Sequence, residues 1–274
     1  MEIRTDLAYE AIKNKNISEV NGIIERNDEY KGVEINKVII ETDEAGEKVN
    51  KPKGTYITMN VSSFLSPCEK EEIETEAISK VIADLIPDGK ILVAGLGNTD
   101  ITPDAIGPLS VSKIFATRHI SMNGVEIDGL GDLREITAVA TGVLGKTGLE
   151  SAETVKCICE YVHPDCVIVI DALACSQIDR LGTTVQITDS GIAPGSGVRN
   201  KRKELSKNSL GVPVIAVGVP TVIDASTLSE SAGDMMVTPR DIDAVVSRAS
   251  KVISLAVNKA MLPSLSFEEI ECLT

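Results

Sequence analysis

Two short apolar segments of this chain each lead to an aspartate, and this feature constrains the fold and the chemistry more than any other. Residues 91–94 (Ile-Leu-Val-Ala) run into a glycine-rich loop that contains Asp104, and residues 166–170 (Cys-Val-Ile-Val-Ile) end directly at Asp171. Short continuous β-branched runs are typical of parallel strands buried on both faces. Ligands in open α/β sheets bind outside the carboxyl ends of such strands. We therefore expect the two carboxyl groups to face one cleft.

The rest of the chain alternates between predicted strands and helices. We expect strands at 33–42, 55–61, 90–94, 166–170, 184–187 and 214–217, helices at 5–15, 66–85, 108–117, 151–161 and 239–261, and an exposed hairpin or loop at 43–47. This alternation predicts an α/β fold: a doubly wound, mostly parallel sheet with flanking helices, plus small β elements near the N-terminus. We treat residues 1–274 as a single domain, because a chain of this length can bury one large core.

Charge and composition argue against several classes of protein. The formal net charge is −14, whereas a nucleic-acid binder needs clustered Lys and Arg for its phosphate contacts. The N-terminus does not resemble a signal peptide, and there is no run of 18 apolar residues for a membrane span. Six scattered cysteines and two histidines give only a weak signal for zinc. We therefore expect a cytoplasmic protein with no metal and no cofactor.

Each aspartate also has a simpler structural explanation. Pro103 disfavours a helical backbone at Thr102, so Asp104 is placed equally well to cap the helix that follows. An acidic residue at a strand end, such as Asp171, often accepts backbone hydrogen bonds from the following turn. If both carboxyls share one cleft, their like charges raise one pKa, so that one holds a proton while the other activates water. Nucleotide binding by the glycine-rich loop is disfavoured, since Asp100 replaces the third glycine of a dinucleotide fingerprint.

Several long motifs follow one another in an order that is specific to a known family. They lie at residues 4–10 (RTDLAYE), 93–98 (VAGLGN), 102–108 (TPDAIGP), 117–119 (TRH), 142–148 (GVLGKTG), 165–174, 191–198 (GIAPGSGV) and 213–225. With these motifs the chain resembles, nearly end to end, the germination proteases of spore-forming Firmicutes, which degrade small acid-soluble spore proteins. The resemblance implies an atypical acid protease with essential aspartates at Asp104 and Asp171. It also implies a fold similar to that of the hydrogenase maturation proteases.

The resemblance implies further properties of the site and of the assembly. Members of the family are homotetramers, are made as zymogens in the forespore, and act in the cytoplasm of the spore core without direct contact to nucleic acid or membrane. They cut after Glu or Asp and before a hydrophobic residue that Ala follows, which requires a cationic pocket. The candidate substrate-binding residues for that pocket are Arg118, His119, Arg199 and Lys201.

One departure and three alternatives stay open at this point. Only Met1, Glu2 and Ile3 precede the first motif, so we expect a missing or very short pro-segment, and slow or absent self-cleavage at Glu2. The hydrogenase maturation proteases bind metal, so a metal-dependent peptidase is one alternative. The others are a non-catalytic holdase of basic spore proteins and a ligand-binding or phosphorolytic protein on the same fold.

Overall fold

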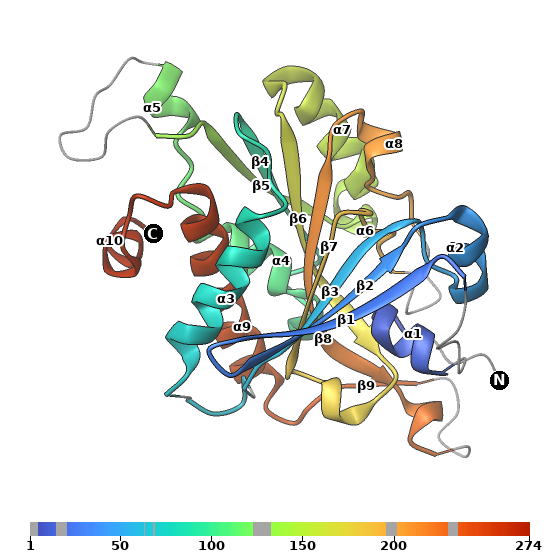
Figure 1. Ribbon diagram of the computed structural model, residues 1–274. Helices are drawn as coiled ribbons and strands as arrows, with labels where there is room; N and C mark the ends of the chain where they lie inside the picture. Colours follow the sequence, from blue (N-terminus) through green and yellow to red (C-terminus); the bar gives the residue numbers. More distant parts are fainter. Residues whose placement is uncertain are drawn as a thin grey trace.

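The computed structural model describes residues 5–14, 21–62, 64–67, 69–122, 133–195, 202–229 and 235–274. These residues form one nine-stranded sheet with helices on both faces (Figure 1). Its strands are β1 (Ile23–Tyr30), β2 (Val33–Ile40), β3 (Gly54–Asn60), β4 (Ile91–Leu96), β5 (Ile136–Gly142), β6 (Cys166–Cys175), β7 (Thr184–Thr188), β8 (Val214–Asp224) and β9 (Met236–Val237). The helices are α1 (Ala8–Asn14), α2 (Asp43–Val49), α3 (Glu71–Ala83), α4 (Ile106–Val111), α5 (Arg118–Met122), α6 (Leu144–Thr147), α7 (Ser151–Val162), α8 (Lys207–Leu210), α9 (Ile242–Met261) and α10 (Phe267–Leu273). Three 3-10 turns accompany them: η1 (Thr102–Asp104), η2 (Ile178–Arg180) and η4 (Ala225–Thr227).

The sheet has a parallel half and an antiparallel half. Its order is β1-β2-β3-β7-β8-β6-β4-β5, with β9 paired to β8. Three pairs are parallel: β8–β6, β6–β4 and β4–β5. Four pairs are antiparallel: β1–β2, β2–β3, β3–β7 and β7–β8. The predicted α/β fold with flanking helices is therefore confirmed. The sheet is mixed, whereas a mostly parallel one was expected, because the strands nearest the N-terminus join it through antiparallel pairs. The β elements near the N-terminus extend this same sheet.

The continuous apolar runs of β4 and β6 reflect burial on both faces. Ile91 and Ile168 belong to a core that also contains residues of α3, α4 and α9, whereas Leu92 and Val169 pack with residues of α7 on the opposite face. Figure 1 shows α3 and α9 on one side of these strands and α7 on the other. Successive side chains of a strand point to opposite faces, so a strand covered on both faces needs an apolar residue at every position.

Several elements differ from the sequence prediction. Residues 43–47 belong to helix α2, because the Thr42 hydroxyl accepts a hydrogen bond from the Ala45 N–H at 3.2 Å and Val49 is buried below. Strand β1, which was not predicted, is mostly exposed and pairs with β2 across a turn at Lys31 and Gly32, both of which have positive φ. Strand β5 was not predicted either. The strands β6 and β8 both continue well past their predicted ends.

Candidate active site

Strand β6 is longer than its neighbour β4, and this difference in length leaves Asp171 without a partner residue on β4. The β4–β6 pairing stops at Gly95 and Ile170. Asp171 is the next residue of β6, and on its other side it still pairs with Gly218 of β8. It therefore lies within a strand, although the sequence predicted a strand end. Its position past the carboxyl end of β4 is nevertheless the one expected for a ligand site in such a sheet.

Asp104 is held in place by main-chain contacts from the loop after β4 and from β8. Gly97 has φ +114°, and a Cβ there would lie 2.0 Å from the main-chain oxygen of Asp104, so only glycine fits. That same oxygen accepts a hydrogen bond from the Asn98 N–H at 2.9 Å. On the other side, the Thr221 hydroxyl of β8 donates to the Pro103 oxygen at 2.7 Å. Together these contacts fix the turn η1.

Helix α4 follows this turn, and its first turn lies directly on the main chain of both strands. A Cβ on Gly107 would lie 2.1 Å from the oxygen of Leu96 in β4 and 2.5 Å from the oxygen of Ile170 in β6. The helix is capped by Ala105, and no side chain makes the cap hydrogen bond. Asp104 is therefore not the cap of α4, and its carboxyl group needs another explanation.

Asp104 and Asp171 line the same cavity, as expected from the sequence. The cavity has a volume of about 440 Å³. Much of its wall is apolar, contributed by Leu96, Ile101, Pro103, Val143, Leu144, Leu173, Val222 and Met236. A cavity of this size with a few converging polar groups is typical of a small ligand site or of part of a peptide-binding site.

The surroundings raise the pKa of both carboxyl groups. Burial raises the pKa of Asp104 to about 6, although the Asn98 backbone hydrogen bond opposes this shift. Burial also raises the pKa of Asp171 well above its usual value, and the negative charge of Asp104 adds to that effect. The Ala172 N–H, which donates to Asp171 Oδ1 at 2.9 Å, partly offsets the increase. Both carboxyl groups therefore keep a proton to a higher pH than a free aspartate does, which suits acid–base chemistry.

One cationic side chain among the described residues lines this cavity, and the sequence analysis missed it. Arg202 is half-buried there, and its backbone N–H donates to the Pro194 oxygen at 3.0 Å. It belongs to the basic run 199–203, from which Arg199 and Lys201 were predicted to bind substrate. Those two residues lie outside the described part of the chain. The run was thus a usable signal, although no local feature singles out Arg202 within it.

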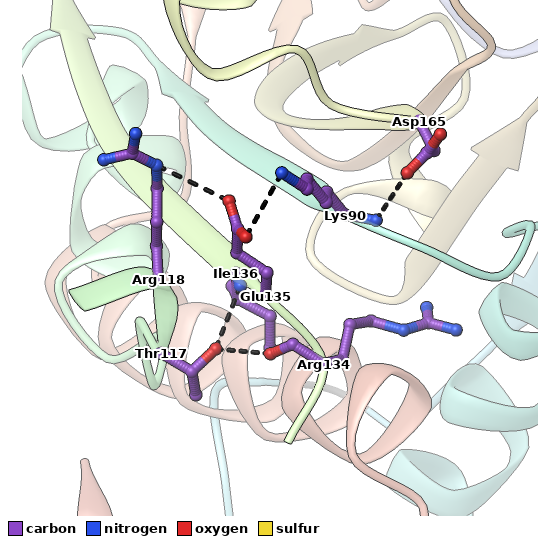
Figure 2. A network of polar contacts seen from close by, with 7 residues as sticks. All are labelled: Lys90, Thr117, Arg118, Arg134, Glu135, Ile136 and Asp165. Carbon is purple, nitrogen blue, oxygen red and sulfur yellow. Dashed lines mark hydrogen bonds and ion pairs between the residues drawn. The ribbon is translucent and has the colours of Figure 1, made fainter. Parts of the chain in front are cut away.

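Arg118 and His119, the other two predicted substrate-binding residues, lie at the opposite edge of the sheet. The Arg118 Nε lies 3.5 Å from Glu135 Oε1, and the Lys90 Nζ lies 3.3 Å from the other oxygen of Glu135 (Figure 2). The Lys90 N–H in turn donates to Asp165 at 2.7 Å. Lys90, Glu135 and Asp165 immediately precede β4, β5 and β6, so this network joins the amino ends of the three strands.

The direction of α4 explains this placement. The predicted helix over residues 108–117 starts next to the Asp104 loop, and Arg118 and His119 follow its far end. A helix that links two parallel strands runs back along the sheet, so its far end lies near the strands' amino ends. Accordingly, the Thr117 N–H donates to the oxygen of Ile136, the first residue of β5, at 3.0 Å. The chain does not bring Arg118 or His119 to its own aspartate pair.

No group of three or more His, Cys, Asp or Glu side chains within the described ranges is placed to hold a metal ion. Within the same part of the chain, no helix has the length and apolar character needed to cross a bilayer.

Comparisons with known proteins agree on one family. Residues 2–234 match the family model described as germination protease. The chain is 38% identical to the germination protease of Caldanaerobacter subterraneus over 98% of its own length and 97% of that protein. It is 36% identical to the one from Clostridium acetobutylicum (98% of each chain), and 41% identical to the one from Bacillus subtilis (85% of this chain, 66% of that protein). Among solved structures, the NiFe hydrogenase maturation protease HycI from Thermococcus kodakarensis matches with a TM-score of 0.39 and 17% identity, over 65% of this chain and 98% of that one.

Proposed function

This chain belongs to the germination protease family, and we propose that it is an endopeptidase that degrades small acid-soluble spore proteins during spore germination. The observation that carries the proposal is the pair Asp104 and Asp171 in one cavity, each with a raised pKa. A peptidase of this kind needs one group to take a proton from water and another to give one to the substrate.

The two different environments support a division of roles between the aspartates. We assign Asp104, whose pKa is about 6, as the base that removes a proton from the attacking water. Asp171, whose pKa is raised well above its usual value by burial and by the charge of Asp104, holds the proton that it donates to the carbonyl oxygen of the scissile peptide. Collapse of the tetrahedral intermediate returns that proton to Asp171. The C–N bond then breaks, and the leaving amine takes up the proton held by Asp104. The pair thus returns to its starting state.

Arg202 supports the proposed cleavage after Glu or Asp. An acidic side chain of the substrate would bind the guanidinium of Arg202, and the hydrophobic residue after the cleaved bond would pack on the apolar wall near Val143, Leu144 and Met236. Arg199 and Lys201 remain candidates for the same pocket, because they are close to Arg202 in sequence. We also propose, from the family, that the protein is a homotetramer made as a zymogen and acting in the cytoplasm of the spore core.

Incubation with a purified small acid-soluble spore protein tests the proposal. We expect fragments that end in Glu or Asp, identified by mass spectrometry, and no fragments with Asp104→Asn or Asp171→Asn. A stable complex without cleavage would favour a holdase instead. The absence of both cleavage and a stable complex would favour a ligand-binding protein.

A further inference from the structure

We propose that the edge of β6 beyond β4 binds the main chain of the polypeptide substrate, with Ala174 and the Lys51 ammonium as its hydrogen-bonding partners. This inference rests on the proposed peptidase function and adds a second site of substrate recognition to it. Arg202 would bind an acidic side chain of the substrate, whereas this site would hold any sequence through its peptide groups.

This edge of β6 lies past the end of its neighbouring strand. The β4–β6 pairing ends at Gly95 and Ile170, whereas β6 continues to Cys175 and pairs with β8 along that stretch. Main-chain N–H groups at every second residue of this stretch donate to carboxylates: Ala172 to Asp171 at 2.9 Å, Ala174 to Asp6 at 2.9 Å, and Ser176, just after the strand, to Glu10 at 2.8 Å. In the described part of the chain, side chains therefore cover main-chain groups that a neighbouring strand would otherwise pair with. An edge of this kind readily accepts an added strand.

A short stretch of polypeptide already lies along this edge. Thr5 and Asp6 precede helix α1, and the Asp6 N–H donates to the Ala174 oxygen at 2.9 Å. The Lys51 Nζ donates to the main-chain oxygens of Thr5 at 3.1 Å and Asp6 at 2.8 Å. These three contacts involve only the main chain of the bound stretch, so any sequence can make them. The site is therefore suited to a peptide backbone.

Lys51 fits such a role because its ammonium needs acceptors. Burial lowers the pKa of Lys51, and the nearby carboxylates of Asp6 and Glu10 oppose that shift. A buried ammonium that lacks hydrogen-bond acceptors is costly. Both acceptors named above belong to residues 5 and 6, so when that stretch leaves, the peptide oxygens of a substrate can take their place.

The site is continuous with the cavity of the aspartate pair. Asp6 and Leu173 line that cavity and also a second cavity of about 500 Å³, which Lys51 lines as well. Ala174 lies three residues after Asp171, which corresponds to roughly 10 Å along a strand. The edge would thus receive the substrate about three residues away from the cleaved bond.

Binding of substrate at this edge requires residues 5 and 6 to leave it. The zymogen processing proposed above would remove them, since residues 6–8 (Asp-Leu-Ala) have the acidic, hydrophobic and Ala order at which the family cuts. The rest of the segment stays anchored, because Leu7 is fully buried in a cluster with Leu173 and because Glu10 keeps its hydrogen bonds to Ser176. A chain that begins at Leu7, released from a cleavable fusion, therefore presents the edge in its open form.

Peptide length combined with Lys51→Met tests the inference in the chain that begins at Leu7. Peptides with five residues on each side of the cut should have a KM about tenfold lower than peptides with two, because only the longer ones reach Ala174 and Lys51. Lys51→Met should abolish this gain, with kcat nearly unchanged and with equal losses for Glu and Gln before the cut. Lys53→Met is the control: Lys53 is an exposed lysine of the same second cavity, and the gain should persist. In the full-length chain the gain should be smaller, because residues 5 and 6 compete for the edge.

Two further measurements leave Lys51 unchanged. In a scan of N-methylated long peptides, methylation at one position about three residues from the cut should raise KM about tenfold, since it removes the N–H that donates to the Ala174 oxygen. Hydrogen exchange gives a readout that is independent of turnover. Residues 172–176 should exchange faster in the chain that begins at Leu7 than in the full-length chain, and a long peptide whose cut bond is reduced to an amine should restore their protection.

Equal KM values for the two peptide lengths, together with no protection of residues 172–176 by the long peptide, would overturn the inference. A gain with length that survives Lys51→Met would overturn the role of Lys51. Near-normal turnover in Asp104→Asn would instead refute the proposed aspartate pair, and the protection of residues 172–176 by the non-cleavable peptide would still decide whether this edge binds a polypeptide.

Discussion

The hydroxyl of Thr221 in β8 donates a hydrogen bond to the main-chain oxygen of Pro103 at 2.7 Å. This bond ties the turn that carries Asp104 to the strand that pairs with β6 beside Asp171. It is one of two sets of contacts that hold the turn, and the other comes from the loop after β4.

Replacement of Thr221 by valine should therefore misplace Asp104 without unfolding the protein. A buried hydrogen bond of this kind contributes about 1 kcal/mol to stability. A small displacement of a catalytic group slows the chemical step more than it weakens substrate binding. We therefore expect kcat to fall about tenfold or more with little change in KM. Thr221→Ser keeps the hydroxyl and serves as the matched control. Steady-state kinetics on a peptide substrate decide the matter, and equal turnover of the valine and serine variants would show that the bond is not needed.

Asp104→Asn and Asp171→Asn should each reduce peptide cleavage by a factor of about a thousand or more, because neither half of an acid–base pair works alone. Circular dichroism should show that both variants stay folded. Asp100→Asn is the control: Asp100 lies in the same loop and is largely exposed, where it forms an ion pair with Lys146. Near-normal turnover in either of the first two variants would place the chemistry elsewhere.

The raised pKa of Asp104, about 6, predicts a pH dependence of stability. An aspartate in the unfolded chain has a pKa near 4, so between about pH 4 and pH 6 the folded state binds more protons than the unfolded state. The contribution of Asp104 to the free energy of unfolding should therefore fall as the pH rises through this window. Because Asp104 is only half-buried, we expect a loss of roughly 1–2 kcal/mol, less than the full shift implies.

Urea unfolding at pH 4.5 and pH 7 measures this loss. Asp104→Asn should reduce the difference in the free energy of unfolding between pH 4.5 and pH 7, since it removes the titrating group. Asp100→Asn should leave the difference unchanged. The expectation fails if the wild type and Asp104→Asn lose stability equally over this range.

Arg202 should determine the preference for an acidic residue before the cleaved bond. We expect Arg202→Gln to lower kcat/KM about 10- to 100-fold for a peptide with Glu at that position, and much less for the same peptide with Gln, because only the former loses a charge-assisted hydrogen bond. Lys203→Gln is the control: Lys203 is exposed and forms an ion pair with Glu153 at 2.7 Å. Equal losses for the two peptides would exclude Arg202 from this role.

Peptidase activity should survive removal of divalent ions. The proposed acid–base pair needs no Lewis acid, and the sequence has two histidines to offer as ligands. The measurement is turnover after dialysis against a chelator, compared with protein dialysed against buffer alone. Activity that is lost and then restored by one divalent ion would favour the metal-dependent alternative.

The parts of this fold that were predictable are those in which local sequence and burial agree. Strands β4 and β6 are covered on both faces, so their apolar runs identified them, and the aspartates that follow were found with them. Strand β1 is polar and exposed, so no periodicity marked it; its pairing with β2 defines it. The placement of Arg118 depended on the direction of a crossover helix, which cannot be derived from local sequence.

The contact of Gly107 with the main-chain oxygens of Leu96 and Ile170 has a consequence for how this protein can change. The gap between the turn of Asp104 and the strand of Asp171 is filled at this point by backbone against backbone. Repacking of side chains in the core, for example Ile168→Val, lowers the free energy of unfolding by about 1 kcal/mol but leaves this contact intact. Substitutions in the core should therefore change the thermal stability of the protein and leave its catalytic geometry unchanged. Related proteins can then differ in their cores and still keep the same spacing between the two carboxyl groups.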